Sequence, residues 1–303
     1  MKVLSLFDGI SCGQIALERV GIKVDEYYAS EIKPKAIEIT QEHYPKTIQI
    51  GDVCKVSYKN GVLYTEKGQF EVGKIDLVIG RSPCQDFSCL KTMRWGGNKG
   101  YNGEKSKLFW EYLRILREVN PKYFLLENVK MKKEYMVNIS NILGYAPNRI
   151  NSSLVSFQTR DRLYWTNINN GVIPLPIDKN VSLQDNFDTN IENLNEAKMN
   201  YTPSRIRMWN GGNGEKLGAC KNITKSEKCR CISRKQDRCP NSGLIAYEGF
   251  ARFLTRAEIE KAQTLPKDYL KNCSYRQVCD LAGDGWTVDI IAHIFSFINE
   301  GDD

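Results

Sequence analysis

The stretch KVLSLFDGISCGQIALERV (2–20) predicts a short buried strand, a glycine-containing turn and an amphipathic helix, in that order. The strand comprises VLSLF (3–7), and the helix covers roughly Gln14 to Val20 before it ends at Gly21. A turn of this kind lets backbone N–H groups approach a ligand closely. The stretch lacks the G-x-G-x-x-G spacing of dinucleotide-binding proteins, so by itself it is weak support for a ligand site.

Strands and helices continue to alternate through the first half of the chain. A second strand (27–30) ends at Glu31, and Pro34 opens the helix that follows. IDLVIG (75–80) is a continuous apolar run, as expected of a strand that is covered on both faces. YFLL (123–126) adds another strand. We therefore predict an α/β fold built on a doubly wound, mostly parallel sheet.

The periodic pattern stops late in the chain and then returns. The sequence predicts a main domain over residues 1–170, a loop-rich insert over 171–250, and a return to the main domain over 251–303. In the returning part, Thr255 and Glu258 have the spacing of a helix capping box.

Positive charge is concentrated in the insert. Residues 201–240 hold ten basic and three acidic residues, which equals the net charge of +7 of the whole chain, so the remainder is neutral. A neutral body with one basic segment predicts a polyanion-binding appendage, while a merely solvated surface loop is the alternative.

Two acidic residues strengthen the ligand site at the first turn. Glu31 follows the second strand and Asp52 follows the third. In a doubly wound fold these positions share the carboxyl edge of the sheet with the turn at 7–13, and ligands bind at that edge. A carboxylate after the second strand can accept from ribose hydroxyls, and one after the third can accept from an adenine amine. The pattern favours adenosine recognition over ordinary loop acids.

The segment GRSPCQDFS (80–88) follows the buried strand directly. Cys84 is preceded by Pro83, which stiffens the backbone at the ligand edge of the sheet. A thiolate is intrinsically nucleophilic and needs only modest activation. A Pro-Cys pair alone is more often structural, so the surrounding sequence has to show whether Cys84 is a nucleophile.

That context is a resemblance to the C5-cytosine DNA methyltransferases, in particular to the catalytic domains of the animal de novo enzymes and to small phage and bacterial relatives. It extends from Met1 to about Phe297 in the motif order of the family. The matching motifs are FDGISCG (7–13), Glu31, GDV (51–53), SPCQDFS (82–88), ENV (127–129), QTRDR (158–162), LTRAEIEKAQTLP (254–266) and GDGWTVDIIAHIF (283–295). The resemblance implies the Rossmann-like fold of S-adenosylmethionine-dependent methyltransferases, with the insert as a smaller target-recognition domain.

The resemblance also implies roles for individual residues. It makes Cys84 the nucleophile and Glu127 the partner of N3 and the exocyclic amine of the target cytosine, while Arg160 and Arg162 flank the base pocket. Asp284 departs from the family, in which many relatives carry Asn, so the contact to the carboxylate end of the cofactor stays open. The implied contacts to S-adenosylmethionine are Phe7, Asp8, Gly9, Ile10, Ser11, Cys12, Glu31, Asp52, Val53, Pro83 and Trp286.

The chemistry explains these residue types. Addition of the Cys84 thiolate at C6 makes C5 enamine-like, so that C5 can attack the methyl group. Glu127 must carry a proton in order to donate a hydrogen bond to N3, where negative charge develops. The target base has to be flipped out of the duplex. The glycine-rich segment 91–103 is expected to close on DNA, and Met93, Arg94 or Trp95 would fill the space that the flipped base leaves in the duplex. A merely flexible surface loop is the alternative.

The insert is expected to recognise double-stranded DNA, with Arg230, Arg234 and Arg238 among its contacts. Its four cysteines, Cys220, Cys229, Cys231 and Cys239, lack the paired C-x2–4-C spacing of structural zinc sites. We predict free thiols and no metal, and zinc binding is the alternative.

The remaining expectations concern setting and partners. No apolar run is long enough to span a membrane, and the start does not read as a signal peptide, so an intracellular protein is expected. We further expect a monomeric cytoplasmic enzyme of bacterial or phage origin. A separately encoded restriction endonuclease is a candidate partner. A tRNA cytosine-5 methyltransferase of the same family and a catalytically inactive DNA-binding regulator are the competing interpretations.

Overall fold

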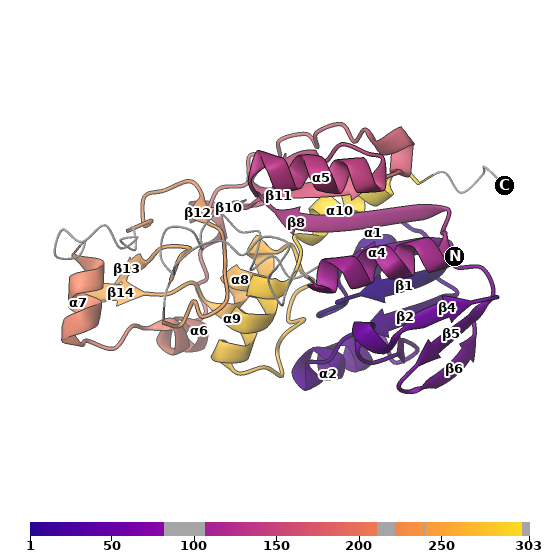
Figure 1. The fold of residues 1–303 in the computed structure, drawn as a ribbon. Helices are drawn as coiled ribbons and strands as arrows, with labels where there is room; N and C mark the ends of the chain where they lie inside the picture. Colours follow the sequence, from indigo (N-terminus) through magenta and orange to yellow (C-terminus); the bar gives the residue numbers. More distant parts are fainter. Residues whose placement is uncertain (82–106, 211–221, 239, 299–303) are drawn as a thin grey trace. The chain divides into compact units, whose positions relative to one another are not determined.

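The computed structural model describes residues 1–81, 107–210, 222–238 and 240–298. It divides into two compact units (Figure 1). Unit 1 comprises Met1–Ile150, Asp161–Leu175 and Ile291–Asp303, and unit 2 comprises Asn151–Arg160 and Pro176–Ile290. Several predicted site residues lie outside the described residues: Pro83, Cys84, Arg94, Cys220 and Cys239, together with Met93 and Trp95.

Unit 1 is built on a seven-stranded sheet in the order β3-β2-β1-β7-β8-β11-β9. The strands from β3 to β8 pair in parallel, whereas β11 runs antiparallel to β8. The predicted α/β fold with a mostly parallel sheet is confirmed. The strands are β1 (Lys2–Leu6), β2 (Glu26–Ser30), β3 (Ile48–Gln49), β7 (Leu77–Gly80), β8 (Tyr123–Val129), β9 (Asn148–Asn151) and β11 (Asp161–Thr166).

Helices surround this sheet at the places that the sequence indicates. Pro34 is the first residue of α2, where its missing N–H costs nothing. In α4 the residues at helical spacing, Phe109, Tyr112 and Leu113, are buried. The helical segments of unit 1 are α1 (Cys12–Arg19), α2 (Pro34–His43), η1 (Val53–Lys55), α4 (Lys107–Val119), α5 (Lys133–Leu143) and η4 (Ile168–Gly171).

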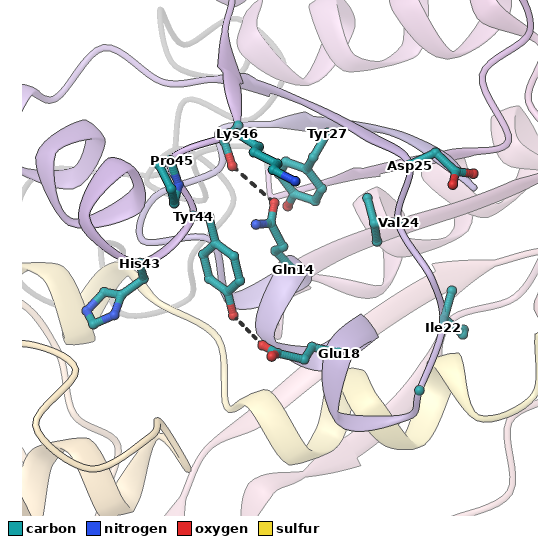
Figure 2. A pocket seen from close by; sticks show the side chains of 12 residues that line it. Gln14, Glu18, Ile22, Val24, Asp25, Tyr27, His43, Tyr44, Pro45 and Lys46 are labelled. Carbon is teal, nitrogen blue, oxygen red and sulfur yellow. Dashed lines mark hydrogen bonds between the residues drawn. The ribbon is translucent and has the colours of Figure 1, made fainter.

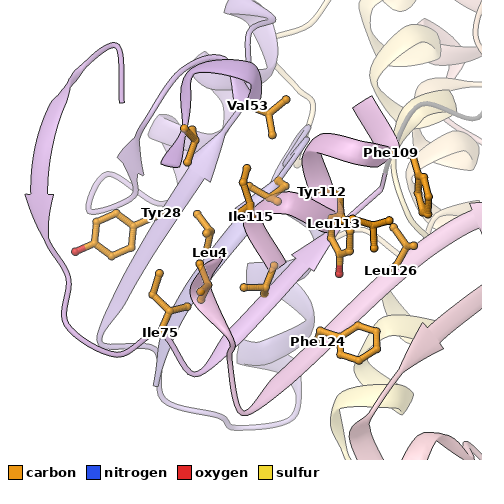
Figure 3. Close-up of a cluster of buried hydrophobic side chains, with 14 of the residues drawn as sticks. Leu4, Tyr28, Val53, Ile75, Phe109, Tyr112, Leu113, Ile115, Phe124 and Leu126 are labelled. Carbon is orange, nitrogen blue, oxygen red and sulfur yellow. The ribbon is translucent and has the colours of Figure 1, made fainter. Parts of the chain in front are cut away.

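The core of unit 1 joins the sheet to α4 (Figure 3). Leu4, Phe124 and Leu126 lie in one apolar cluster with Phe109 and Tyr112. The residues that alternate with them along the strands, such as Val3 and Leu125, are equally buried, so both faces of the sheet are covered.

A small antiparallel meander, which the sequence patterns did not indicate, interrupts unit 1 between η1 and β7. It consists of β4 (Ser57–Lys59), β5 (Val62–Thr65) and β6 (Gly68–Glu71). Leu63 and Val72 are fully buried in the core of unit 1, so the meander is anchored to that core.

Unit 2 has little regular structure, in line with its Asn-, Gly- and Lys-rich sequence. Met199, Leu244, Ala251 and Phe253 form a small core of its own. The predicted capping box is present at the start of α8, because Thr255 and Glu258 exchange side-chain-to-backbone hydrogen bonds. Its elements are η3 (Ser152–Leu154), β10 (Gln158–Thr159), η5 (Gln184–Asn186), α6 (Ile191–Ala197), α7 (Pro203–Trp209), β12 (Cys229–Arg230), β13 (Ile245–Tyr247), β14 (Phe250–Arg252), α8 (Arg256–Ala262) and α9 (Tyr275–Asp284).

The compact units and the predicted domains divide the chain differently. Residues 251–290 belong to unit 2, whereas the sequence pattern groups 251–303 with the main domain. Helix α10 (Val288–Phe295) crosses the boundary between the units. The functional division at 170 and 250 stays a prediction. Within the described ranges, no helix is both long enough and apolar enough to cross a membrane.

Candidate active site

The turn after β1 has an unusual backbone conformation. Phe7, Gly9 and Ser11 have φ values of 59°, 66° and 53°, all in the left-handed region. Only glycine adopts this region freely, so the two other residues must be held there by their surroundings. Apart from Gly9 and its chain neighbours, no heavy atom of the described residues lies within 4 Å of the position that a Cβ on Gly9 would take, so these residues leave open space above it.

Asp8 explains how the turn is held. Its carboxylate accepts hydrogen bonds from the hydroxyls of Ser5 (2.6 Å), Ser11 (2.5 Å) and Tyr27 (2.8 Å). Burial raises the pKa of Asp8, and the three hydroxyl hydrogen bonds oppose that rise. The side chain is therefore used inside the loop, and its part in cofactor binding would be to shape the loop.

Glu31 links the ends of β1 and β2. One carboxylate oxygen accepts from the N–H of Gly9 (2.8 Å), and the other accepts from the N–H groups of Ile32 and Lys33 (both 2.9 Å). The structure thus brings Glu31 to the predicted turn. Ile10 and Cys12 are buried and pack within unit 1.

Asp52 lies at the end of β3 and caps η1. Its Oδ1 accepts from the N–H of Cys54 (3.0 Å), and Val53 is buried beneath it. The ends of three neighbouring parallel strands thus carry Asp8, Glu31 and Asp52 along one edge of the sheet. Two partly exposed carboxylates beside an open glycine turn fit the ribose and adenine of an adenosine-containing cofactor.

Glu127 is the buried carboxylate of the same edge. It lies near the end of β8 and is only 1% exposed. Its Oε1 is 3.0 Å from Nε of Arg162, and its Oε2 is 3.3 Å from Nε of Arg81. Because β11 runs antiparallel to β8, the start of β11 lies where β8 ends, and this places Arg162 diagonally across from Glu127.

Arg81 is a site residue that sequence reasoning missed. It follows β7 directly and therefore lies at the carboxyl edge, one strand away from Glu127. A basic residue at the end of a buried strand, three positions before Cys84, is the signal that could have identified it.

Arg160 belongs to unit 2, and its guanidinium is buried there. It donates to the carbonyls of Ile232 (2.9 Å), Gly283 (3.3 Å) and Gly285 (2.8 Å), and to the Cys231 sulfur (3.3 Å). These contacts tie three distant segments of unit 2 together. A role beside the target base stays a prediction, because the contacts described here are all structural.

The GDGW segment packs within unit 2. Trp286 is buried, and Asp284 lies 3.5 Å from Nε of Arg234. A Cβ on Gly283 would stand 2.4 Å from the backbone nitrogen of Arg234, so glycine is required for this close approach. The residue that departs from the family thus has an ionic partner in the basic segment.

The predicted DNA contacts differ in their surroundings. Arg234 pairs with Asp284 and, at 3.7 Å, with Asp280, and Arg238 lies 3.5 Å from Asp237. The Arg230 residue is exposed. Among the cysteines, Cys229 is buried and burial raises the pKa of its thiol, while Cys231 is partly exposed. The described part of the chain contains no group of three or more potential metal ligands, and free thiols stay a prediction because Cys220 and Cys239 lie outside it.

Unit 1 also has a cavity of about 500 Å³ at the opposite edge of the sheet (Figure 2). Its lining comes from the segments that precede β2 and β3 and from the helix that follows the first turn, and it includes none of the predicted site residues. Tyr44 donates to Glu18 (2.8 Å) and Thr47 donates to Gln14 (3.2 Å) across it. Tyr27 also lines the cavity, and its hydroxyl connects it to Asp8 of the first turn.

Comparison with known proteins identifies the family. The model of the C-5 cytosine-specific DNA methylase family matches residues 1–300. The chain belongs to the C-5 cytosine-specific DNA methylase family. The resemblance seen in the sequence motifs is therefore confirmed, and methyltransferases of this family use S-adenosylmethionine as their methyl donor.

Relatives of this chain include two phage proteins. The orphan methyltransferase M.Rho11sI of Bacillus phage rho11s is 33% identical over 132 residues, which cover 43% of this chain and 23% of that protein. The orphan methyltransferase M.SPRI of Bacillus phage SPR is 29% identical over 186 residues, or 57% of this chain and 39% of that protein. The chain thus spans well under half of the length of these relatives. Among solved structures, the Entamoeba histolytica methyltransferase EhMeth has the same fold, with a TM-score of 0.73 at 18% identity over 98% of this chain and 97% of that chain.

Proposed function

We propose that the chain transfers the methyl group of S-adenosylmethionine to C5 of a flipped-out cytosine in a specific site of double-stranded DNA. The observation that carries the proposal is Glu127, a buried carboxylate held between Arg81 and Arg162 at the ligand edge of the sheet. A buried acid flanked by two cations at such an edge is typical of a functional site. Family membership assigns the reaction type.

Cytosine C5 is not nucleophilic enough to take a methyl group directly. In the proposed mechanism the thiolate of Cys84 adds to C6, forming a carbon–sulfur bond and moving electron density to C5 and N3. Glu127, as the neutral acid when the base is bound, donates a proton at N3 and accepts from the exocyclic amine. The bound cofactor supplies an electrophilic methyl group to C5. Loss of the C5 proton to solvent, expulsion of the Cys84 thiolate and return of the N3 proton to the Glu127 carboxylate restore the aromatic ring and the starting form of the acid.

The arginines have positioning roles in this proposal. Arg162 and Arg81 hold Glu127 at the end of β8. Arg160 fixes the folded state of unit 2 through backbone carbonyls, and its predicted place beside the base depends on this support. Cys84 is three residues beyond Arg81, which ties the nucleophile to the same edge through the sequence.

The residues of the sheet edge fit the cofactor. Glu31 is proposed to accept from the ribose hydroxyls, and Asp52 is proposed to accept from the adenine amine. The open space above Gly9 leaves room for the ligand, with Asp8 holding the loop in shape. The further contacts implied by the resemblance, including Phe7, Pro83 and Trp286, are part of the proposal.

Recognition of DNA is proposed for the basic segment of unit 2, with Arg230, Arg234 and Arg238 meeting phosphates or guanines. We further propose a monomeric cytoplasmic protein that works either alone or beside a separately encoded restriction endonuclease. Two curated relatives are named orphan methyltransferases, and another, from Fusobacterium nucleatum, is named a type II methyltransferase.

A covalent trap tests the proposed reaction. Fluorine at C5 is small enough to enter the site but cannot leave as a cation, so duplex DNA with 5-fluorocytosine at the target should stall as a methylated adduct. The adduct should survive denaturing electrophoresis, and peptide mapping should place it on Cys84. Cys84→Ser should form none, because a serine hydroxyl is a far weaker nucleophile without an adjacent base.

The same experiment separates the competing functions. An inactive regulator would trap nothing, and a tRNA enzyme would trap only the RNA analogue. An adduct mapped to Cys89 or to the cysteines at 220–239 would overturn the assignment of the nucleophile.

A further inference from the structure

Glu66, in the turn between β5 and β6, contacts the GDV segment from the unpredicted meander. Its Oε1 accepts from the N–H of Asp52 (2.9 Å), and its Oε2 accepts from Nζ of Lys55 (2.7 Å). One carboxylate therefore binds both ends of the turn that contains η1. The Lys55 ammonium, and after it the Asp52 N–H, lower the pKa of Glu66, so it is charged at neutral pH.

The turn itself is held on its other side by β2. The hydroxyl of Ser30 donates to the carbonyl of Gly51 (2.8 Å), and the N–H of Cys54 donates to the Asp52 carboxylate (3.0 Å). The backbone and the side chain of Asp52 thus both have fixed partners. Glu66 is the one among these partners that comes from the meander.

Gly51 shows how closely Glu66 approaches. This glycine has φ of +81°, and a Cβ there would stand 2.2 Å from Oε1 of Glu66. Any side chain at this position would displace the Glu66 carboxylate, so glycine is required both by the backbone conformation and by the contact.

The meander that carries Glu66 is anchored in the core of unit 1. Leu63 and Val72 of the meander are fully buried, and the N–H groups of Val72 and Gly73 both donate to the carbonyl of Gly61 (2.8 Å). The Glu66 side chain is 29% exposed although it projects from a hairpin turn. Glu66 thus projects from an anchored hairpin and contacts Asp52 and Lys55, and these contacts hold the turn in place.

We propose that Glu66 is a positioning residue that sets selectivity for adenine in the cofactor, because it holds the Asp52 backbone where the Asp52 carboxylate meets the exocyclic amine. The inference rests on the proposed function, which gives Asp52 its contact with adenine. It adds the residue, and the meander that carries it, on which that contact depends.

Calorimetric titration with two ligands tests this role. S-adenosylhomocysteine carries the adenine amine, and S-inosylhomocysteine has a carbonyl in its place. Glu66→Ala should weaken binding of the adenosyl ligand about tenfold, the loss of roughly one hydrogen bond, and leave binding of the inosyl ligand nearly unchanged. The ratio of the two affinities should therefore narrow about tenfold.

Matched variants separate positioning from general stability. Glu66→Gln keeps an oxygen acceptor for the Asp52 N–H and should retain most of the ratio. Glu66→Asp shortens the side chain, so it should narrow the ratio even if Glu66→Ala does not fold. Glu71→Ala, at an exposed position in β6 of the same meander, should leave both affinities unchanged.

The possible outcomes are distinct. An unchanged ratio in Glu66→Ala or in Glu66→Asp, or an equal loss of affinity for both ligands, overturns the role of Glu66 while leaving the proposed function intact. Failure of the unmodified protein to bind S-adenosylhomocysteine overturns the proposed function and this inference with it.

Discussion

Each unit contains a buried arginine–glutamate group, and the two groups differ in geometry. In unit 2, Arg252 contacts Glu258 through two nitrogens at 2.7 and 2.8 Å, and both side chains are almost fully buried. The Glu258 carboxylate also accepts from the N–H groups of Thr255 and Asp188 (both 2.9 Å). In unit 1, Oε1 of Glu127 lies 3.0 Å from Nε of Arg162, and Oε2 lies 3.3 Å from Nε of Arg81.

The ion pair at Glu258 is structural, whereas the pairs at Glu127 belong to the proposed active site. The bidentate pair at Glu258 fixes the capped start of α8, and its oxygens are occupied by backbone N–H groups and the guanidinium. The ion-pair distances at Glu127 are longer than those at Glu258, and these pairs lie at the edge of a parallel sheet, where ligands bind. Burial alone therefore does not distinguish the two carboxylates, and the position of Glu127 at the sheet edge is what supports its proposed catalytic role.

The largest expected effect is on catalysis at Glu127. Glu127→Gln keeps the size of the side chain but removes its acid function, so kcat should fall about 10²–10⁴-fold. Single-turnover methylation measures the loss, and calorimetry should show unchanged affinity for S-adenosylmethionine. A variant that keeps full turnover would remove Glu127 from the reaction.

The second effect is on stability at Glu258. Glu258→Gln breaks a buried ion pair and should lower the free energy of unfolding by about 3–5 kcal/mol. Glu248→Gln is the matched control, because its pair with Lys198 is half exposed and contributes at most about 1 kcal/mol. Denaturant unfolding compares the two variants, and equal losses would contradict the contrast between the units.

A third carboxylate, Asp8, lies partly buried among hydroxyls instead of arginines. Its pKa is raised in the folded state, mainly by burial, so the folded protein binds this proton more tightly than the unfolded chain does. The stability that it contributes is therefore present at pH below the ordinary pKa and is lost as the pH rises through the raised value. Each pH unit between the two pKa values corresponds to about 1.4 kcal/mol.

The Asp8→Asn variant should lack this titration. The unfolding free energy of the unmodified protein minus that of Asp8→Asn should decrease from about pH 4 toward neutrality, as followed by urea titration. A difference that does not depend on pH would show that Asp8 titrates alike in both states.

The smallest expected effect concerns exposed arginines. Replacing Arg230, Arg234 and Arg238 with Ala should weaken DNA binding and reduce the slope of log affinity against log salt by about 0.9 for each phosphate that the variant no longer neutralises. Arg234 is expected to contribute least, because it already pairs with Asp280 and Asp284. Cofactor affinity is the control and should not change. An unaltered slope would exclude these residues from binding the phosphates.

Local sequence patterns predicted the parts of the fold that depend on interactions between residues close together in the chain. The apolar runs in β1 and β7, Pro34 at the start of α2 and the capping box at Thr255 all follow from spacing within a few residues. The sheet-edge residues could be predicted as well, because parallel strands place their ends together.

Contacts between distant segments could not be predicted in this way. The pairing of Arg81 with Glu127 depends on which strands become neighbours, and the binding of Arg160 to the carbonyls of Ile232 and Gly285 depends on loops without periodicity. Glu66 is an ordinary acid in a hairpin turn until the fold brings it to Asp52.

The path of the chain between the units has a consequence for folding during synthesis. Unit 1 takes its final helical residues from the segment that begins at Ile291, after all of unit 2 has been made. Ile291, Ile294 and Phe295 are fully buried, so the apolar surface that they cover stays exposed until these residues have been synthesised. Contacts of such long sequence separation slow folding, and apolar surface that is still exposed is prone to aggregation. The nascent N-terminal segment should therefore be the state of this protein that most needs a chaperone.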